Sequence, residues 1–337
     1  MSSLSPVLNA KPCSWYFWAA SFVLALVLGV GALYYATNQI DYVWRWYRVP
    51  QYFYFHDKVE IRAEIDGDVI SIQSEGTATA ITVRGYEGEK ETYRAQNAQI
   101  TVDEGDSVYA GDPMMFYQEW KIGILLQGLI LTLKVSCAAI LFGILIGLFA
   151  GIARISENPL LRWSSITYIE LIRGSPLLVQ IFIWYFVLGT LVNDILAKQE
   201  TGLQLPPLWF GVAALAVFTG AYVAEMVRAG IQSIHRGQTE AARSLGMNYA
   251  QTMIHIILPQ AMRHILPPLA GQFISLVKDS SLLGLIAIRE LTKATREVVT
   301  TSLQPFELWF ICAILYLLLT FSLSMFVQYL ERRTATK

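Results

Sequence analysis

The chain has 337 residues, of which 54% are hydrophobic and only 15% are charged, with a net charge of −1. A soluble globular protein carries about 25% charged residues, so this composition argues against a soluble enzyme. Intrinsic disorder is excluded, because it requires low hydrophobicity and high net charge. The three cysteines, Cys13, Cys137 and Cys312, are too far apart for a disulfide framework or a zinc spacing. The composition is that of an integral membrane protein.

Six stretches are long and apolar enough for a membrane helix, which needs about 20 residues. We predict spans at roughly 15–36, 122–153, 165–192, 207–230, 260–288 and 306–330. The first could be a cleaved signal peptide, but its apolar core exceeds the usual length of about 7–15 residues, which favours an uncleaved anchor. The fifth is the weakest span, because two prolines and the charged pair Lys278 and Asp279 interrupt it.

The basic residues predict the orientation, because cytoplasmic loops carry an excess of Lys and Arg. If every span crosses once, three basic groups fall on one side: Arg154 and Arg162; Arg228, Arg236, Arg243 and Arg263; and Arg332, Arg333 and Lys337. We therefore expect a multi-pass protein of the inner (plasma) membrane with cytoplasmic termini, residues 1–14 and 334–337. Arg45 and Arg48 fall outside in this topology, and we interpret them as part of an interfacial segment with neighbouring aromatic residues.

The predicted extracytoplasmic segment, residues 37–119, changes character at about residue 55. Residues 55–119 contain fourteen acidic and five basic residues, a net charge of −9, so the remainder of the chain carries +8. Short runs alternate at period two and are separated by glycines, a pattern typical of strands and turns. The sequence predicts a small all-β domain at about 55–116.

Within this segment, residues 100–113 read Ile-Thr-Val-Asp-Glu-Gly-Asp-Ser-Val-Tyr-Ala-Gly-Asp-Pro. They resemble a hairpin of biotinyl- and lipoyl-type barrel-sandwich domains. No lysine stands at a modification hairpin with the usual flanking residues, so a structural or docking module is favoured over a covalent carrier.

A short helix is predicted at about 239–247, between the fourth and fifth spans. Glu240 is expected to open it, because an acidic side chain is favourable at a helix N-terminus, and Gly246 to end it. Arg243 lies between the two, and Ala241, Ala242 and Leu245 form a compact apolar face. So short a helix is marginal alone, which indicates contact with a partner protein. The alternative is a surface helix with alanines chosen for propensity.

This stretch, with Ile256-Ile257-Leu258-Pro259 after it, matches the "EAA---G---------I-LP" signature of ABC importer permeases at every defined position. Further segments resemble the polar-amino-acid permease family of these importers: 127–133, 158–161, 170–180, 220–225, 228–234 and 272–282. The resemblance covers about 120–333 and leaves out the first span and the acidic insert. Gln272 stands where the family pattern has Asn, a change that keeps an amide.

The resemblance implies an all-α polytopic fold, with five core helices of a type I ABC importer permease plus one N-terminal helix. It implies a transport subunit, not an enzyme, without a cofactor of its own. Separate ATPase subunits would bind ATP and Mg, and the helix at 239–247 would lie in their cleft. A second permease and a periplasmic amino-acid-binding protein complete the expected assembly in the lipid bilayer, with no nucleic acid. In agreement, the chain has no Gly-x-x-x-x-Gly-Lys-Ser/Thr phosphate loop.

Polar residues inside spans are costly and usually face a partner or a cavity. Lys278 and Asp279 are candidates for contacting the charged groups of an amino acid; the alternative is a structural ion pair with Glu225 or Arg228. Glu225 and Arg228, one turn apart, are expected to pair near an inner gate. Gln180 and Gln272 are further candidates for the pathway, although a single amide is also common between packed helices.

Gly143, Gly147 and Gly151 recur every four residues in the second span and predict a close helix crossing. Two other functions remain open. One is a membrane-anchored adaptor whose β-domain is the working part, and the other is a secondary transporter, which would need an ion-coupling site and commonly has inverted repeats.

Overall fold

The computed structural model describes residues 13–200 and 202–335. Lys337 and most of the predicted segment 1–14 therefore lie outside the described residues. Among these described residues, six helical stretches are long and apolar enough to cross a membrane, which confirms the predicted number: Phe17–Gln39, Ile124–Arg154, Leu177–Lys198, Pro207–Gln232, Tyr249–Ile286 and Pro305–Tyr329. The chain forms two compact units, residues 1–46 and 47–337.

The first unit consists of α1 (Cys13–Gln39) and the turn that follows it. Thr37 is buried there, accepts a hydrogen bond from the indole of Trp44 at 3.2 Å, and donates to the carbonyl of Tyr34 at 2.8 Å. The indole rings of Trp44 and Trp46 stack with centroids 5.6 Å apart. Indole rings that pair an apolar body with a polar N–H suit a membrane–water interface.

The second unit begins at Tyr47, within η1 (Trp46–Tyr52), and continues into a set of antiparallel strands. The strands are β1 (Tyr54–Arg62), β2 (Gly67–Glu75), β3 (Ala78–Gly85), β4 (Lys90–Gln96), β5 (Gln99–Ile100), β6 (Ser107–Val108) and β7 (Pro113–Ile122). They form two small sheets, with strand orders β1-β7-β5 and β4-β3-β2-β6. Three of the runs that alternate at period two, 59–65, 69–72 and 79–85, correspond to β1, β2 and β3, and the first of them extends three residues past the end of β1.

Alternating side chains from both sheets form a common core. Ile81 and Val83 of β3 pack with Met114 and Met115 of β7, and all four are completely buried. Several of the acidic side chains are used within turns: Asp112 accepts from the N–H of Tyr109 at 3.0 Å, for example. Part of the negative charge of this segment therefore stabilises its own turns.

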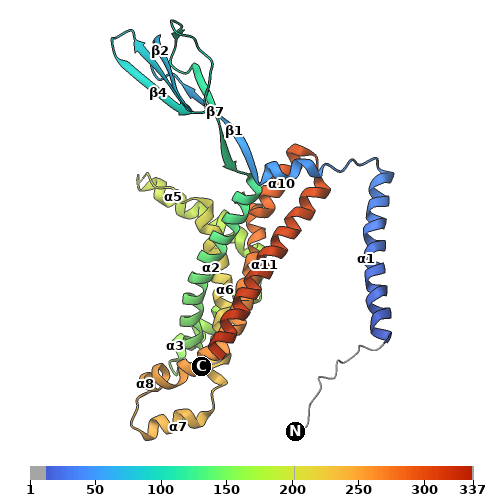
Figure 1. Cartoon of the computed structure of the whole chain (residues 1–337). Helices are drawn as coiled ribbons and strands as arrows, with labels where there is room; N and C mark the ends of the chain where they lie inside the picture. Colours follow the sequence, from blue (N-terminus) through green and yellow to red (C-terminus); the bar gives the residue numbers. More distant parts are fainter. Residues whose placement is uncertain (1–12, 201, 336–337) are drawn as a thin grey trace, which may run out of the picture. The chain divides into compact units, whose positions relative to one another are not determined.

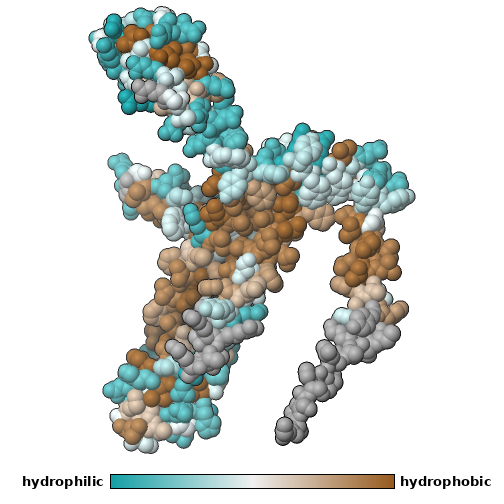
Figure 2. All heavy atoms as spheres, in the orientation of Figure 1, coloured by the Kyte–Doolittle hydropathy of each residue, from teal (hydrophilic) through white to brown (hydrophobic). Residues whose placement is uncertain are grey.

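The remainder of the second unit is helical. Its elements are α2 (Ile124–Arg154), α3 (Pro159–Arg173), α4 (Leu177–Phe182), η2 (Ile183–Gly189), α5 (Thr190–Lys198), α6 (Pro207–Gln232), α7 (Arg236–Ser244), α8 (Tyr249–Thr252), η3 (Met253–Ile257), α9 (Leu258–Asp279), η4 (Ser280–Ile286), α10 (Leu291–Ser302) and α11 (Pro305–Ala335). Helices α7 and α8 lie at one end of the α2–α6–α11 bundle, and α10 lies at the other (Figure 1). Hydrophobic side chains cover the length of this bundle, whereas hydrophilic ones are frequent at the α7 end and over the strands, where smaller hydrophobic patches also lie (Figure 2).

The predicted close crossing of the second span is confirmed, and its partner is α6. A Cβ built on Gly143 would lie 3.0 Å from the Cβ of Thr219, and one built on Gly147 would lie 2.4 Å from the Cβ of Val223. At Gly151 the added atom would lie 2.7 Å from a backbone oxygen of α6. The glycines thus let the two backbones approach more closely than any side chain would permit.

Two predicted spans differ from the observed ones. The third, expected at 165–192, is interrupted: α3 ends at Arg173, and the chain resumes at α4 after Gly174-Ser175-Pro176. Pro176 has extended backbone angles and cannot continue the preceding helix. The fifth, expected at 260–288, begins earlier, at Tyr249, and passes through Pro267 and Pro268 without a break in α9. It changes at Asp279, where the α-helix gives way to the 3₁₀ turn η4.

We predict that Gly147→Ala destabilises the protein by about 1–3 kcal/mol, because the added methyl overpacks the contact with Val223. Thermal unfolding in detergent measures the effect as a lower Tm. The matched control is Gly29→Ala in α1, where an added Cβ would meet no atom within 4 Å. Equal Tm values for the two variants would show that the α2–α6 contact is looser than described.

Candidate functional site

Helix α7 is the short helix expected between the fourth and fifth spans, but it begins earlier than predicted. It opens at Arg236, not at Glu240, because the imidazole Nδ1 of His235 accepts a hydrogen bond from the N–H of Gly237 at 3.1 Å and caps the helix. The expected stop is confirmed. Gly246 has φ +80°, and the N–H groups of Gly246 and Met247 reach back to Arg243 and Ala242 at 2.9 and 3.1 Å.

The apolar face of α7 is divided between its own chain and the exterior. Ala242 is buried, and α7 packs on η3. Ala241 and Leu245, four residues apart on the same side of the helix, are exposed, and Leu245 is 82% exposed. Glu240 and Arg243 are exposed as well. Ala242 therefore anchors the helix, while Ala241 and Leu245 project outward, so only part of the predicted apolar face is open to a partner.

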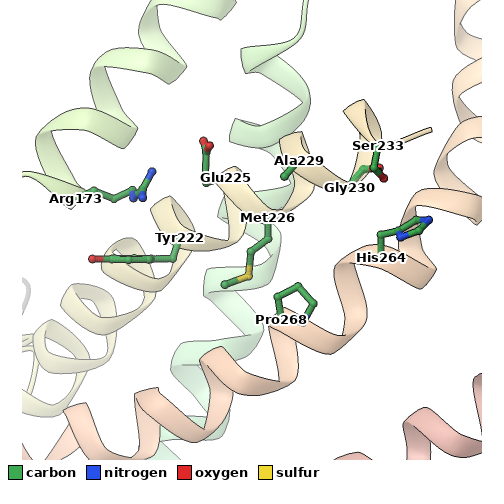
Figure 3. Close-up of a pocket in the computed structure, with 9 residues that line it drawn as sticks. All are labelled: Arg173, Tyr222, Glu225, Met226, Ala229, Gly230, Ser233, His264 and Pro268. Atoms are coloured by element: carbon green, nitrogen blue, oxygen red, sulfur yellow. The ribbon is translucent and has the colours of Figure 1, made fainter. Parts of the chain in front are cut away.

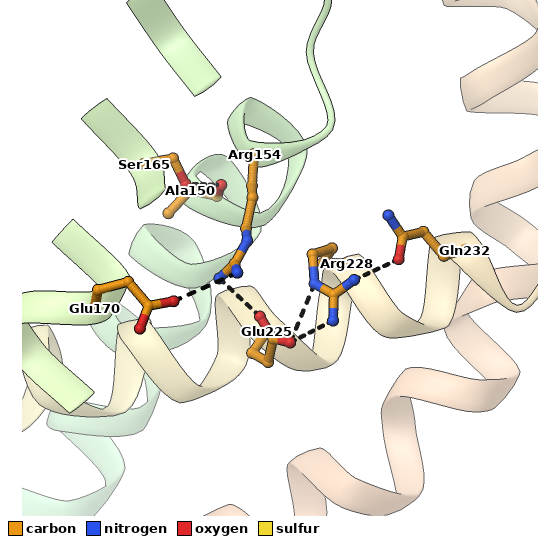
Figure 4. Close-up of polar contacts among 7 residues, drawn as sticks. All are labelled: Ala150, Arg154, Ser165, Glu170, Glu225, Arg228 and Gln232. Carbon is orange, nitrogen blue, oxygen red and sulfur yellow. Dashed lines mark hydrogen bonds and ion pairs between the residues drawn. The ribbon is translucent and has the colours of Figure 1, made fainter. Parts of the chain in front are cut away.

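An ion network joins the ends of α2, α3 and α6 near α7 (Figure 4). Arg154, the last residue of α2, lies 2.9 Å from Glu225 of α6 (Nη1 to Oε2) and 3.5 Å from Glu170 of α3 (Nη2 to Oε1). Arg228 donates from Nε to Glu225 at 3.1 Å and also pairs with Gln232. The expected pairing of Glu225 with Arg228 is confirmed, and Glu225 lies between two guanidinium groups.

A cavity of about 410 Å³ lies beside this network, between α3, α6 and α9 (Figure 3). Arg173 and Glu225 give it one positive and one negative wall, and His264 and Pro268 of α9 close the opposite side. The guanidinium of Arg173 lies 5.4 Å from the centre of the Tyr222 ring, a cation–π contact. The cavity thus combines apolar surface with opposite charges.

Lys278 and Asp279 do not belong to the ion network around Glu225 and Arg228. None of the ion pairs among the described residues joins the two groups, so the structural ion pair considered from the sequence is wrong. Lys278 is exposed on α9, and Asp279 is half-buried. Lys278 borders a second cavity, of about 310 Å³, together with Thr292 of α10 and Tyr316 of α11.

The two candidate glutamines differ in their surroundings. Gln180 is buried, and its Nε2 donates to the carbonyl of Ile172 at 2.7 Å and to the hydroxyl of Ser175 at 2.9 Å. This amide therefore holds the turn between α3 and α4, although its Oε1 has no hydrogen-bond partner within the described ranges. Gln272 is half-exposed on α9, two turns before Lys278.

Three residues of these sites were not predicted: Arg154, Arg173 and Glu290. Glu290 is completely buried and caps α10, accepting from the N–H groups of Thr292 at 2.8 Å and Lys293 at 2.7 Å. It also accepts from the hydroxyl of Tyr316 at 2.9 Å. Burial raises the pKa of the Glu290 carboxyl. A Glu directly before a helix is a signal that could have been read from the sequence. The ion partners of Arg154, which are distant in the chain, could not have been read from the sequence.

The described residues contain no group of three or more His, Cys, Asp or Glu side chains that could hold a metal ion. What they do contain is a polytopic helical bundle with charged cavities between spans and an outward-projecting helix at one end. These features define a membrane transport component with a surface for another protein.

The chain belongs to the family of binding-protein-dependent transport system inner membrane components, whose family model matches residues 143–336. It is 40% identical over 208 residues to the probable glutamine ABC transporter permease protein GlnM of Bacillus subtilis (strain 168), which covers 62% of this chain and 92% of that protein. It is 36% identical over 212 residues to the glutamine transport system permease protein GlnP of Escherichia coli (strain K12), covering 63% and 93%.

Solved structures show the same relationship. A chain in the crystal structure of an amino acid ABC transporter with histidines is 38% identical and matches with a TM-score of 0.54, over 62% of this chain and 94% of that one. A chain of the inward-facing MetNI methionine ABC transporter shares the fold, with 19% identity and a TM-score of 0.52 over 62% and 95%. The helical core therefore has a type I ABC permease fold.

Membership in this family makes the chain a transporter permease subunit and not an enzyme, and permeases of this kind carry no cofactor of their own. It also implies ATPase and binding-protein partners and a paired permease. The findings favour neither the adaptor nor the secondary transporter considered from the sequence. Residues 1–142, including the strands, lie outside the matched family model.

We predict that Arg154→Met and Glu225→Gln are non-additive in Tm, with a coupling of about 1 kcal/mol or more, because the half-buried pair joins α2 to α6. A double-mutant cycle by thermal unfolding measures this coupling. The more exposed pair Arg289–Glu297, at 2.8 Å, provides the control cycle, for which we expect about 0.5 kcal/mol or less. Equal couplings in the two cycles would contradict a role for the network in holding the helices.

Proposed function

We propose that this chain forms the translocation pathway of an ABC importer for a polar or charged amino acid. A periplasmic binding protein delivers the amino acid, and separate ATPase subunits, which bind ATP and Mg, drive its transport. The relatives named for glutamine transport support the substrate class. The observation that carries the proposal is α7, a capped helix that bears the EAA signature and projects Leu245 away from its own chain.

The residues proposed for ATPase coupling are Glu240, Ala241, Ala242, Arg243, Leu245 and Gly246. Ala242 attaches the helix to the permease, while Leu245 and Ala241 enter a socket on the ATPase. Gly246 keeps the helix short, because its φ of +80° is unfavourable for other residues. Movement of the ATPase subunits would then tilt the spans as rigid bodies.

This assignment places the α7 end of the bundle in the cytoplasm, together with both termini. The arginines near α7 agree with it, since basic residues are retained on the cytoplasmic side. The strands would then face the periplasm, as a small all-β domain with a barrel-sandwich arrangement. Two sheets that share one buried core, at Ile81 and Met114, support that description.

For the amino acid we propose a route along α9, with Lys278 and Asp279 contacting its carboxylate and ammonium groups and Gln272 lying along the same helix. Lys278 lies eight residues before the end of its span at Ile286, at least about 12 Å at 1.5 Å per residue. At a depth where lipid tails surround the helix, its exposed ammonium group would require a hydrated pathway or a protein partner. Gln180 positions the α3–α4 turn, and Glu225 and Arg228 lie beside the cavity at the cytoplasmic exit.

We predict that Glu240→Lys uncouples ATP hydrolysis from uptake, because reversing a charge at a protein interface costs enough to lower uptake about tenfold or more. Uptake and ATPase activity are measured with the complete transporter in proteoliposomes. The control is Glu157→Lys, an exposed acid in the α2–α3 loop outside α7. Unchanged uptake in Glu240→Lys would refute the coupling role.

We also predict that Lys278→Met lowers uptake about tenfold or more, since a hydrogen bond to a charged group contributes about 1.5–3 kcal/mol. Basal ATPase activity should persist, and Lys278→Arg should retain part of the uptake. Lys198→Met, which removes an exposed lysine from the end of α5, is the control. If Lys278→Met transports like the unmodified protein, α9 does not supply the contact with substrate.

A further inference from the structure

The strand region contains a groove that the transport pathway does not use. It has a volume of about 650 Å³ and lies between β4 and the β1–β7 pair. Its lining includes Arg94 and Gln96 of β4, Asn97 after that strand, Gln118 and Glu119 of β7, and Ile61 of β1. The volume lies within the range of about 300–1,000 Å³ that is typical of small-molecule pockets.

The groove exists because β5 is only two residues long. It pairs with Met115 and Phe116 of β7 and then ends. In the described part of the chain, no strand continues along this edge of β7, where Gln118 follows. The carbonyl of Met114 points toward β5 and accepts a hydrogen bond from the N–H of Thr101 at 2.9 Å. The backbone groups of every second residue of a strand point to the same side, so those of Gln118 also point toward this edge, which is open there. The groove therefore offers backbone donors and acceptors as well as side chains.

The charged residues that line the groove form no ion pair, unlike the charged residues nearby. Nearby, Lys121 pairs with Asp57 at 2.7 Å and Arg62 pairs with Glu60 at 3.0 Å. Within residues 13–200 and 202–335, Arg94 and Glu119 form no ion pair or side-chain hydrogen bond. The lining of one cavity thus includes an arginine and a glutamate that form no ion pair, with Lys121 as the cation that acts electrostatically on Glu119.

We infer that this groove binds a free α-amino acid, and this inference rests on the proposed function. The guanidinium of Arg94 suits the α-carboxylate in a two-pronged hydrogen bond, and Glu119 suits the α-ammonium group. Gln96 and Asn97 provide side-chain donors and acceptors for a polar side chain, and Gln118, whose side chain stands on the opposite face of β7 from Glu119, contributes through its backbone. Because both charges are exposed, the affinity is weak, with a Kd on the order of 1 mM. The strands, which lie outside the matched family model, thereby add an accessory amino-acid site to the transporter.

The test uses the full-length chain in nanodiscs with L-glutamine as the probe and ligand-observed NMR as the readout. All measurements are made on a Lys278→Met background, so that binding in the proposed pathway does not contribute. We expect saturable binding that weakens about fivefold or more in Arg94→Gln and in Glu119→Gln, since each removes one charged contact. Glutamine analogues that lack the carboxylate or the ammonium group should bind as weakly as these variants do.

Arg84→Gln and Glu87→Gln are the controls, because they remove exposed charges at the other end of the β3–β4 hairpin. Unchanged binding in Arg94→Gln and Glu119→Gln, or no saturable binding to the Lys278→Met protein, would overturn the inference. Equal Tm values for all four variants would show that weaker binding does not result from a loss of folded protein. Uptake by the otherwise unmodified transporter, measured separately, reports on the proposed function independently of the groove.

Discussion

The close contact of α6 with its neighbours determines how the helical core is assembled. Gly147 of α2 lies against Val223, and Gly230 of α6 lies against α9, where an added Cβ would be 2.4 Å from Cγ1 of Ile265. In a bilayer the lipid tails are as apolar as the side chains, so helix association depends on this kind of packing. Because α6 has a close neighbour on more than one side, a displacement of α6 requires α2 and α9 to respond.

Two clusters of charged side chains among the described residues connect neighbouring helices near their ends. Arg154 terminates α2, where its charge is favourable at the negative end of the helix, and it reaches α3 and α6 through Glu170 and Glu225. Glu290 has the corresponding role at the other end of the bundle, where it caps α10 and contacts α11 through Tyr316. Glycines allow close packing along the middle of the helices, and carboxylates connect the helices near their ends. An ion pair in the middle of the bundle would carry a high desolvation cost.

Much of this arrangement follows from local signals in the sequence. Apolar run lengths predict the six spans, the spacing of Gly143, Gly147 and Gly151 predicts the close crossing, and Gly246 predicts the end of α7. The third span was misjudged because hydropathy averages over the Gly174-Ser175-Pro176 break, whose effect is on backbone angles. The partners of Arg154 were beyond prediction, because they depend on how three distant helices pack. The start of α7 was missed because histidine is an uncommon capping residue.

In the proposed assembly, two surfaces of this chain would meet different partners. Lys278 is exposed within a span, where contact with lipid tails is unfavourable, so water or protein must cover it inside the membrane. Leu245 is 82% exposed on a short helix whose other apolar side is already buried. That helix lies at a hydrophilic end of the bundle, so its partner is a water-soluble protein surface (Figures 1 and 2). In the proposed assembly, a paired permease beside α9 would cover Lys278, and an ATPase against α7 would cover Leu245.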